Sequence, residues 1–150
     1  MTQTLIGLPP HVDANAWKGL LAHAESQTYH RGDIIFADRS QGDRIYLIVD
    51  GPVEIVKETQ PGQDVRLAIL ENGIMFGERC LFGDGRRSAT ARAFGTVELL
   101  SIPATSVKAY LDAHPDFAVQ FYRSLCERFS QLVFDLDSDL RALHHRLSFL

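Results

Sequence analysis

The feature that most limits the possible folds is a series of short strand-like runs between residues 26 and 102, separated by turns rich in glycine. The runs have the two-residue apolar period of strands, and pairs such as Asp50-Gly51 and Asn72-Gly73 are typical of tight turns. About eight strands are expected, at residues 27–30, 34–36, 44–50, 53–57, 65–70, 75–76, 89–93 and 97–102. Many short strands with turns at this spacing predict a β-sandwich or jelly roll.

Helical patterns flank these strands. Asp13 is a good N-cap, and the apolar stripe that follows it predicts a short amphipathic helix. Thr105 or Ser106 is expected to cap a second helix ending at Ala113, and Pro115 suits the first position of a third helix. We therefore expect a helical lead-in at 1–25, a β-roll at 26–103 and C-terminal helices at 104–150, within one domain of 150 residues.

The last of these helices, expected at 115–150, carries an apolar heptad pattern. Its apolar residues recur at alternating spacings of three and four, which is the a/d pattern of a coiled coil. This seam consists of Val119, Tyr122, Cys126, Phe129, Val133, Leu136, Leu140, Leu143, Leu147 and Leu150. The pattern favours a parallel homodimer through residues 119–150, although the first half of the seam could instead pack on the β-roll.

The segment 75–93, which we call the cassette, combines an anion site with one acceptor. Gly77 permits close approach of the backbone to a ligand, and residues 78–82 are long enough for one helical turn with free N–H groups. Arg87 supplies a guanidinium that suits phosphate, and Ser88 adds a hydroxyl. A carboxylate beside a phosphate repels it unless the carboxylate accepts a hydrogen bond from a hydroxyl of the ligand, so Glu78 indicates a ribose 2′-OH. The simpler alternative is a hairpin whose charges form a solvated cluster.

In order and spacing, the cassette resembles the phosphate-binding cassette of the cyclic nucleotide-binding domain family, and residues 29–36 and 43–55 resemble the opening of that family's β-roll. The resemblance, closest to the Crp/Fnr-like effector domains, implies a jelly roll with a short N-terminal helix and a long dimerisation helix. It also implies a non-catalytic sensor of cyclic AMP or cyclic GMP, with no further cofactor and no metal. The implied ligand-binding residues are Gly77, Glu78, Arg79, Cys80, Leu81, Arg87, Ser88, Ala89 and Thr90. Arg86 departs from the pattern, because many members have proline there.

Recognition of the base is less defined. The resemblance places the helix positions that would offer hydroxyls to the base at Leu132 and Val133, which are both apolar. The base is therefore expected to pack among Leu70, Met75 and Leu132, or to contact a polar residue such as Ser130. The choice between cyclic AMP and cyclic GMP stays open.

Charge and composition exclude several classes. The net charge of −4 argues against unaided binding to nucleic acid. The resembling transcription factors carry a helix-turn-helix after the long helix, so we expect either a free-standing sensor or the effector domain of a longer regulator. No apolar run is long enough for a membrane span, and the first residues lack the basic start of a signal peptide, so a cytoplasmic location is expected.

Other chemistries fit the sequence less well. A cupin-type metalloenzyme needs a histidine pair on strands, and His30 is the one histidine in the strand region. The same roll could sense haem, cyclic di-GMP or another effector, but haem would leave Glu78 and Arg87 without a role. The two cysteines, Cys80 and Cys126, are expected to be small buried side chains.

Overall fold

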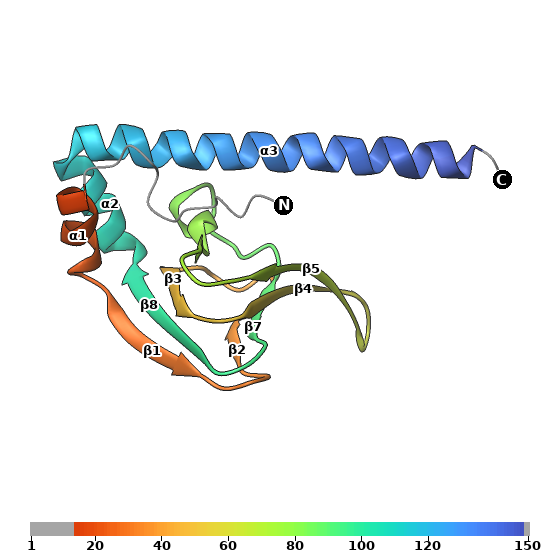
Figure 1. Cartoon of the computed structure of the whole chain (residues 1–150), viewed down its shortest axis with the longest axis horizontal. Coiled ribbons are helices and arrows are strands. Elements are labelled where there is room, and N and C mark those ends of the chain that lie inside the picture. The colour runs from red at the N-terminus through yellow and green to blue at the C-terminus, as the bar shows by residue number, and fades with distance from the viewer. Residues whose placement is uncertain (1–13, 149–150) are drawn as a thin grey trace.

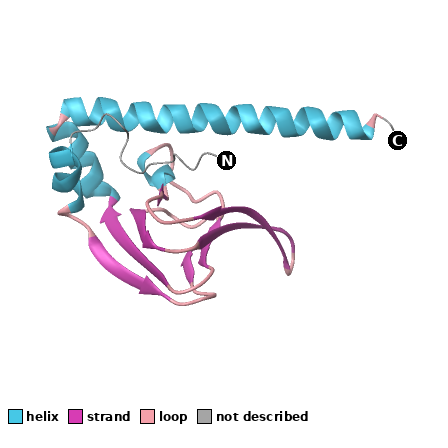
Figure 2. Cartoon of the chain, in the orientation of Figure 1, coloured by secondary structure: helices cyan, strands magenta, loops and turns pink. Residues whose placement is uncertain are grey.

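The computed structural model describes residues 14–148, in which two four-stranded antiparallel sheets face one another and helices cover one end of the roll (Figures 1 and 2). One sheet has the strand order β1-β8-β3-β6 and the other β2-β7-β4-β5. The strands are β1 (Glu25–Tyr29), β2 (Ile34–Phe36), β3 (Arg44–Asp50), β4 (Val53–Gln60), β5 (Gln63–Leu70), β6 (Met75–Phe76), β7 (Thr90–Ala93) and β8 (Val97–Pro103). The expected jelly roll is confirmed, and each expected strand is present with small shifts at its ends.

Two apolar clusters hold the roll together. One lies among the strands and includes Ile48, Val53 and Leu99, which are fully buried. The second lies beneath the helices and joins Leu20, Val107 and other helical residues to β3 and the cassette. Each buried large aliphatic side chain stabilises the fold by roughly 1.5–3 kcal/mol, so the helices are an integral part of the domain.

The three helices are α1 (Ala14–Leu21), α2 (Ala104–Ala113) and α3 (Pro115–Leu147). The prediction that Thr105 or Ser106 caps α2 is wrong, because the helix already begins at Ala104 and no side chain caps it. Pro115 does open α3, where its missing N–H has no partner to lose. Helix α1 is the short helix expected in the lead-in. Residues 1–13 and 149–150 lie outside the described part of the chain, and with them the first half of the lead-in, the expected cap Asp13 and the seam residue Leu150.

Helix α3 is long enough to extend beyond the roll. Its 33 residues span about 50 Å, and its C-terminal end reaches past the strands in Figure 1. Phe117, Phe121 and Leu125 are buried against the domain, whereas every residue from 130 to 148 is exposed. Within residues 14–148, none of the helices has the length and apolar character needed to cross a membrane.

A buried carboxylate ties three strands of one sheet together. Glu54 on β4 is almost inaccessible and accepts hydrogen bonds from Arg66 on β5, at 2.9 Å from Nη2, and from Arg92 on β7, at 2.6 Å from Nε. Burial raises the pKa of the Glu54 carboxyl, but the two arginine hydrogen bonds outweigh it and hold the pKa below its ordinary value of 4.5. The ionised carboxylate therefore stabilises the sheet.

Glu54→Gln should lower the free energy of unfolding at neutral pH by about 1–2 kcal/mol, because both arginines keep partial access to water. A carboxyl whose pKa is lowered by folding contributes stability above its unfolded pKa, and that contribution is lost as the pH falls through the folded value. The difference between the parent and Glu54→Gln should thus shrink below pH 4.5. Urea unfolding at a series of pH values measures it, and a difference that stays constant down to acid pH would contradict this role for Glu54.

Candidate functional site

The cassette begins with a turn that only glycine fits. After β6 the chain turns at Gly77, whose φ of 83° lies in the left-handed region, and enters the short 3₁₀ helix η1 (Glu78–Leu81). A Cβ added to Gly77 would lie 2.8 Å from Nη1 of Arg87. The predicted helical turn is therefore present, and a glycine is needed where the chain passes closest to the arginine.

Arg87 lies inside the roll, with 4% of its surface exposed. Its Nη1 donates to the Gly77 carbonyl at 2.6 Å, and its Nη2 donates to the Arg44 carbonyl at 2.7 Å. The guanidinium carbon lies 4.1 Å from the centre of the Phe36 ring and 5.9 Å from that of Tyr46. Nε of Arg87 is buried and has no partner. Burial raises the pKa of the Tyr46 phenol above 10.0, and the charge of Arg87 opposes this shift.

Glu78 is joined to helix α3 by a buried ion pair. It is 7% exposed, and its Oε1 lies 3.0 Å from Nη1 of Arg128, which also donates to the Met75 carbonyl at 3.3 Å. Nε of Arg128 is buried without a partner. The acidic and basic groups of the site thus come from two parts of the chain that lie 50 residues apart in sequence.

Sequence reasoning missed Arg128. A signal was available, because Phe121, Leu125 and Arg128 recur at the four- and three-residue spacing of one helix face. The first two of these are buried against the domain, so the third had to lie over the roll as well. The apolar seam on the neighbouring face is the stronger pattern, and Arg128 was therefore not predicted to be part of the site.

The second half of the cassette runs from η1 back into β7. Ser88 is exposed, Ala89 is buried, and the Thr90 hydroxyl accepts a hydrogen bond from the Asp38 amide at 3.0 Å. Arg79 lies at the surface, where its Nε donates to the Arg86 carbonyl at 3.0 Å. The structure therefore places the phosphate-binding candidates on one continuous turn of chain around Arg87.

The two cysteines differ in environment. Cys80 in η1 is buried in the helical cluster, as expected, and burial raises the pKa of its thiol above 9.0. Cys126 on α3 is exposed, so the expectation that both cysteines are buried is wrong for this one. Cys126 belongs to the seam and not to the helix face of Phe117, Phe121 and Leu125, which is buried against the domain.

The cassette also touches the seam side of α3. The ring of Phe82, which follows η1, lies 6.3 Å from that of Tyr122 and 6.4 Å from that of Phe129. Phe129 also packs against the helical cluster. Beyond it the seam has no cover from the described chain, and the large side chains of Val133, Leu136, Leu140, Leu143 and Leu147 are all exposed.

The residues predicted to surround the base do not lie together in this chain. Leu70 and Met75 belong to different apolar clusters, where they fill the core. Ser130, Leu132 and Val133 are exposed on α3. Leu132 has 44% of its surface exposed and packs against neither apolar cluster.

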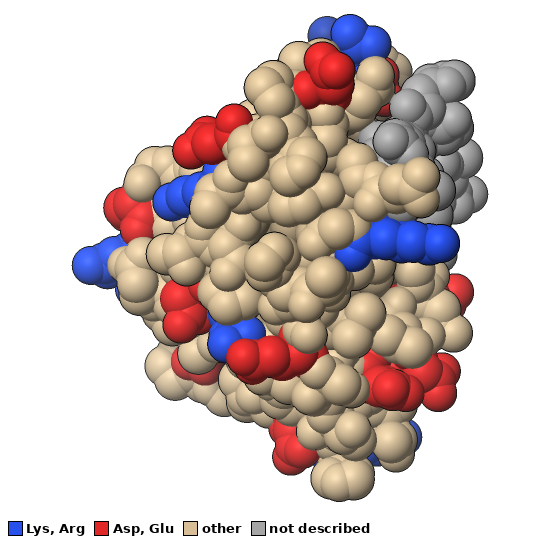
Figure 3. Space-filling view, turned by 90° about the vertical axis from the view of Figure 1, so that its left-hand side faces the viewer, with Lys and Arg blue, Asp and Glu red and all other residues tan. Residues whose placement is uncertain are grey.

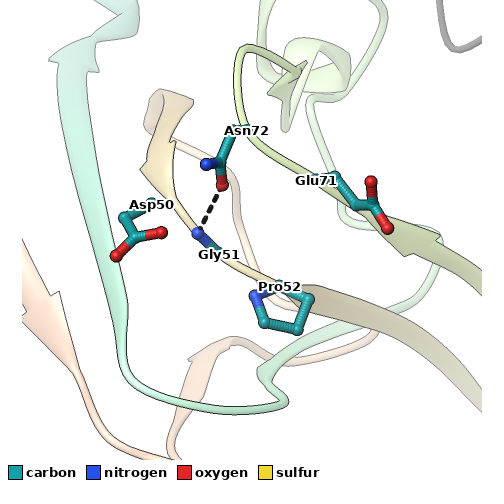
Figure 4. Close-up of a pocket in the computed structure, with 5 residues that line it drawn as sticks. All are labelled: Asp50, Gly51, Pro52, Glu71 and Asn72. Carbon is teal, nitrogen blue, oxygen red and sulfur yellow. Dashed lines mark hydrogen bonds between the residues drawn. The ribbon is translucent and has the colours of Figure 1, made fainter.

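Other surface features do not compete with the cassette. A hollow elsewhere on the surface is lined by Asp50, Gly51, Pro52, Glu71 and Asn72, and the Asn72 side chain accepts a hydrogen bond from the Gly51 amide at 2.8 Å (Figure 4). It contains no cassette residue. On the face seen in Figure 3, both signs of charge are scattered between large uncharged areas. Among residues 14–148, no cluster of three or more acidic, histidine or cysteine side chains could hold a metal ion.

Comparison with known proteins identifies the family of the domain. Residues 26–114 match the model of the cyclic nucleotide-binding domain. The chain is 28% identical over 122 residues to a CRP-like cAMP-activated global transcriptional regulator of Mycobacterium tuberculosis, which covers 81% of this chain and 54% of the relative. It is 31% identical over 117 residues to the cyclic AMP receptor protein of Thermus thermophilus, covering 78% of this chain and 54% of that protein.

A solved structure shows the same fold. The catabolite activator protein of Thermus thermophilus superimposes with a TM-score of 0.75 at 28% identity, over 85% of this chain and 60% of that one. The chain spans about half the length of the curated relatives that it matches. The matched family model covers both the roll and the cassette, and the chain therefore belongs to the cyclic nucleotide-binding domain family, as a Crp/Fnr-like member.

Proposed function

We propose that this chain is a non-catalytic sensor that binds cyclic AMP or cyclic GMP at the cassette and signals through helix α3. The observation that carries the proposal is the buried pair of Glu78 and Arg128, because it joins the cassette to the helix at the edge of the roll. The family supports the class of ligand. The particular nucleotide and the signal through α3 are our inference.

The charges around Gly77 suit a ribose phosphate. A cyclic phosphate carries one negative charge, which the guanidinium of Arg87 matches together with the hydroxyl of Ser88. Glu78 accepts a hydrogen bond from the ribose 2′-OH, and Arg128 balances the charge of this carboxylate so that it does not repel the phosphate. The family resemblance also places the backbone of Leu81 and Ala89 at the phosphate, and Arg79, Cys80 and Thr90 shape the turn around the ligand.

The base would meet α3. Leu132 and Val133 offer apolar surface and no hydrogen-bonding side chain, so packing contributes more than polar contacts to recognition of the base. Both residues are exposed in one chain, and a second α3 at the seam would enclose the space beside them. The names of the two relatives make cyclic AMP the first nucleotide to test.

Signalling would follow the contacts between the cassette and α3. A ligand that hydrogen-bonds to the Glu78 carboxylate changes the ion pair between Glu78 and Arg128. A shift of η1 would also move Phe82 relative to Tyr122 and Phe129 on α3. Such a ligand changes the position of α3 only if it binds the two positions with different affinity. Regulation of transcription, which the names of longer relatives state, would then require DNA-binding residues beyond those in this sequence.

Arg87→Lys should weaken binding of the cyclic nucleotide by roughly 2–5 kcal/mol, because lysine keeps the charge but loses the planar fork. Arg86→Met is the matched control. This neighbouring arginine is exposed, and its nearest acid, Asp84, is exposed too and lies 3.9 Å away. Calorimetric titration with cyclic AMP and cyclic GMP measures the effect, and thermal melts confirm that the variants fold. Equal affinity of the Arg87→Lys variant and the parent would show that the phosphate binds elsewhere.

Glu78→Gln and Arg128→Met should each lower the free energy of unfolding of the ligand-free chain by roughly 1–3 kcal/mol, because each leaves a buried charge without its partner. The double variant should lose less free energy of unfolding than the sum of the two single variants, because it leaves neither charge buried without a partner. Urea unfolding gives the three values. Arg123→Met, an exposed arginine on the same helix, is the control. Simple additivity would refute the coupling between cassette and helix.

Leu136→Asp combined with Leu143→Asp should convert the chain to monomers, because two charges would then lie in the apolar seam. Phe134→Asp is the matched control. Phe134 is as exposed as its neighbour Val133, with 66% of its surface accessible, but it lies off the a/d pattern. Sedimentation velocity separates the outcomes.

Cys126 adds a test of the direction of pairing. In a parallel, in-register pair the two Cys126 side chains face each other at an a position, so mild oxidation should join the chains. Cys126→Ser should abolish the cross-link, whereas the buried Cys80 should not form one. A parent chain that sediments as a monomer, or dimers that persist in the double Asp variant, would remove the α3 dimer from the proposal.

A further inference from the structure

Residues 87–90, which we call the phosphate-binding arm, are held in place by the β2–β3 loop. This loop, residues 37–43, runs beside the arm. The Arg39 amide donates to the Arg87 carbonyl at 2.9 Å, and the Arg87 amide donates to the Ser40 carbonyl at 2.9 Å. Arg39 holds a φ of 65°, which L-residues seldom adopt. The backbone of the loop is therefore strained at Arg39, where the loop contacts the arm.

Two charged side chains reinforce this contact. Lys57 on β4 places its Nζ 2.9 Å from Oδ2 of Asp38 in the loop. The same ammonium group donates to the Ser88 carbonyl at 2.9 Å. The Asp38 amide donates to the Thr90 hydroxyl at 3.0 Å. Lys57 thus joins the loop, the arm and β4 at one point, next to the side chains placed at the phosphate.

The hydrogen bond to Ser88 has a consequence for the next amide. The peptide bond between Ser88 and Ala89 is trans, and in a trans peptide the C=O and the N–H point in opposite directions. Since Lys57 holds the Ser88 carbonyl on its own side, the Ala89 N–H is directed to the other side of the arm. The Ala89 side chain is buried. The ammonium group also polarises this peptide unit and makes the N–H a stronger donor.

We propose that Lys57 and Asp38 are positioning residues, which aim the Ala89 N–H at a non-bridging oxygen of the bound phosphate. Asp38 orients the ammonium group, and Lys57 orients the peptide. Neither residue needs to touch the ligand. The inference rests on the proposed binding of a cyclic nucleotide, and it adds a determinant of how that phosphate is recognised.

Lys57 could also favour phosphate binding simply through its positive charge. The variant Asp38→Asn distinguishes this effect from positioning of the peptide. If Lys57 acted only as a nearby positive charge, removal of the negative charge of Asp38 would strengthen binding of an anion. If the pair positions the peptide, the same change should weaken binding, because Lys57 loses the group that orients it. We expect Asp38→Asn and Lys57→Met each to weaken binding about tenfold, the cost of one poorly aimed hydrogen bond to a charged group.

The two phosphorothioate diastereomers of the cyclic nucleotide report the aim of the N–H directly. Sulfur accepts hydrogen bonds poorly, so the parent should discriminate between the two isomers, which differ in the non-bridging position that carries sulfur. Lys57→Met should reduce this discrimination, and Lys57→Arg, which retains a donor, should restore it. A variant that was merely less stable would lose affinity for both isomers equally.

Titration calorimetry tests the proposal. The parent and the variants Lys57→Met, Lys57→Arg and Asp38→Asn are each titrated with the nucleotide and with both isomers. Lys18→Met, on the exposed face of α1, is the control. Failure of the parent itself to bind would overturn the proposed function, and this inference with it. A parent that binds, beside variants with unchanged affinity and unchanged discrimination, would overturn the positioning role alone. Tighter binding by Asp38→Asn would also overturn it, in favour of simple charge.

Discussion

The buried guanidinium of Arg87 sets the geometry of this domain. A charge in the interior must find hydrogen-bond partners, and here the partners are backbone carbonyls of Gly77 and Arg44. The first carbonyl follows β6 and the second lies at the start of β3, so one side chain joins the cassette to the sheet. The Phe36 ring lies against the guanidinium, with its centre 4.1 Å from the guanidinium carbon. Gly77 follows as a requirement, because a larger residue would collide with the guanidinium.

The same site adds a polar link between the roll and the helices. An apolar link is already present, because the cluster beneath the helices includes Ile45 of β3 and Ile102 of β8. Glu78 and Arg128 form a buried ion pair between the cassette and α3, and the Phe82 ring lies near the rings of Tyr122 and Phe129 on the same helix. A buried pair of this kind contributes little net stability, because desolvation offsets most of the attraction, but it penalises strongly any state in which only one partner is satisfied. Cassette and helix are thus coupled by charge.

The fold was predictable because its signals are local. Alternating apolar residues and glycine-containing turns placed all eight strands, and Pro115 marked the start of α3. Contacts between distant segments were not predictable in this way. The partner of Glu78 lies 50 residues further along, and the hydrogen bond from Lys57 to the Ser88 carbonyl depends on the pairing of β4 with β7. The start of α2 was missed because the helix has no capping side chain to mark it.

Helix α3 explains why the base pocket could not be assembled from one chain. Up to Phe129 the helix rests on the domain, and from residue 130 onward every described side chain is exposed. An isolated helical segment of this length is marginal in water, and its apolar seam adds exposed surface that favours association. Leu132 and Val133 stand just past the point where support from the roll ends. Contacts to the base there depend on what covers the seam, so recognition of the base and pairing of α3 are one structural problem.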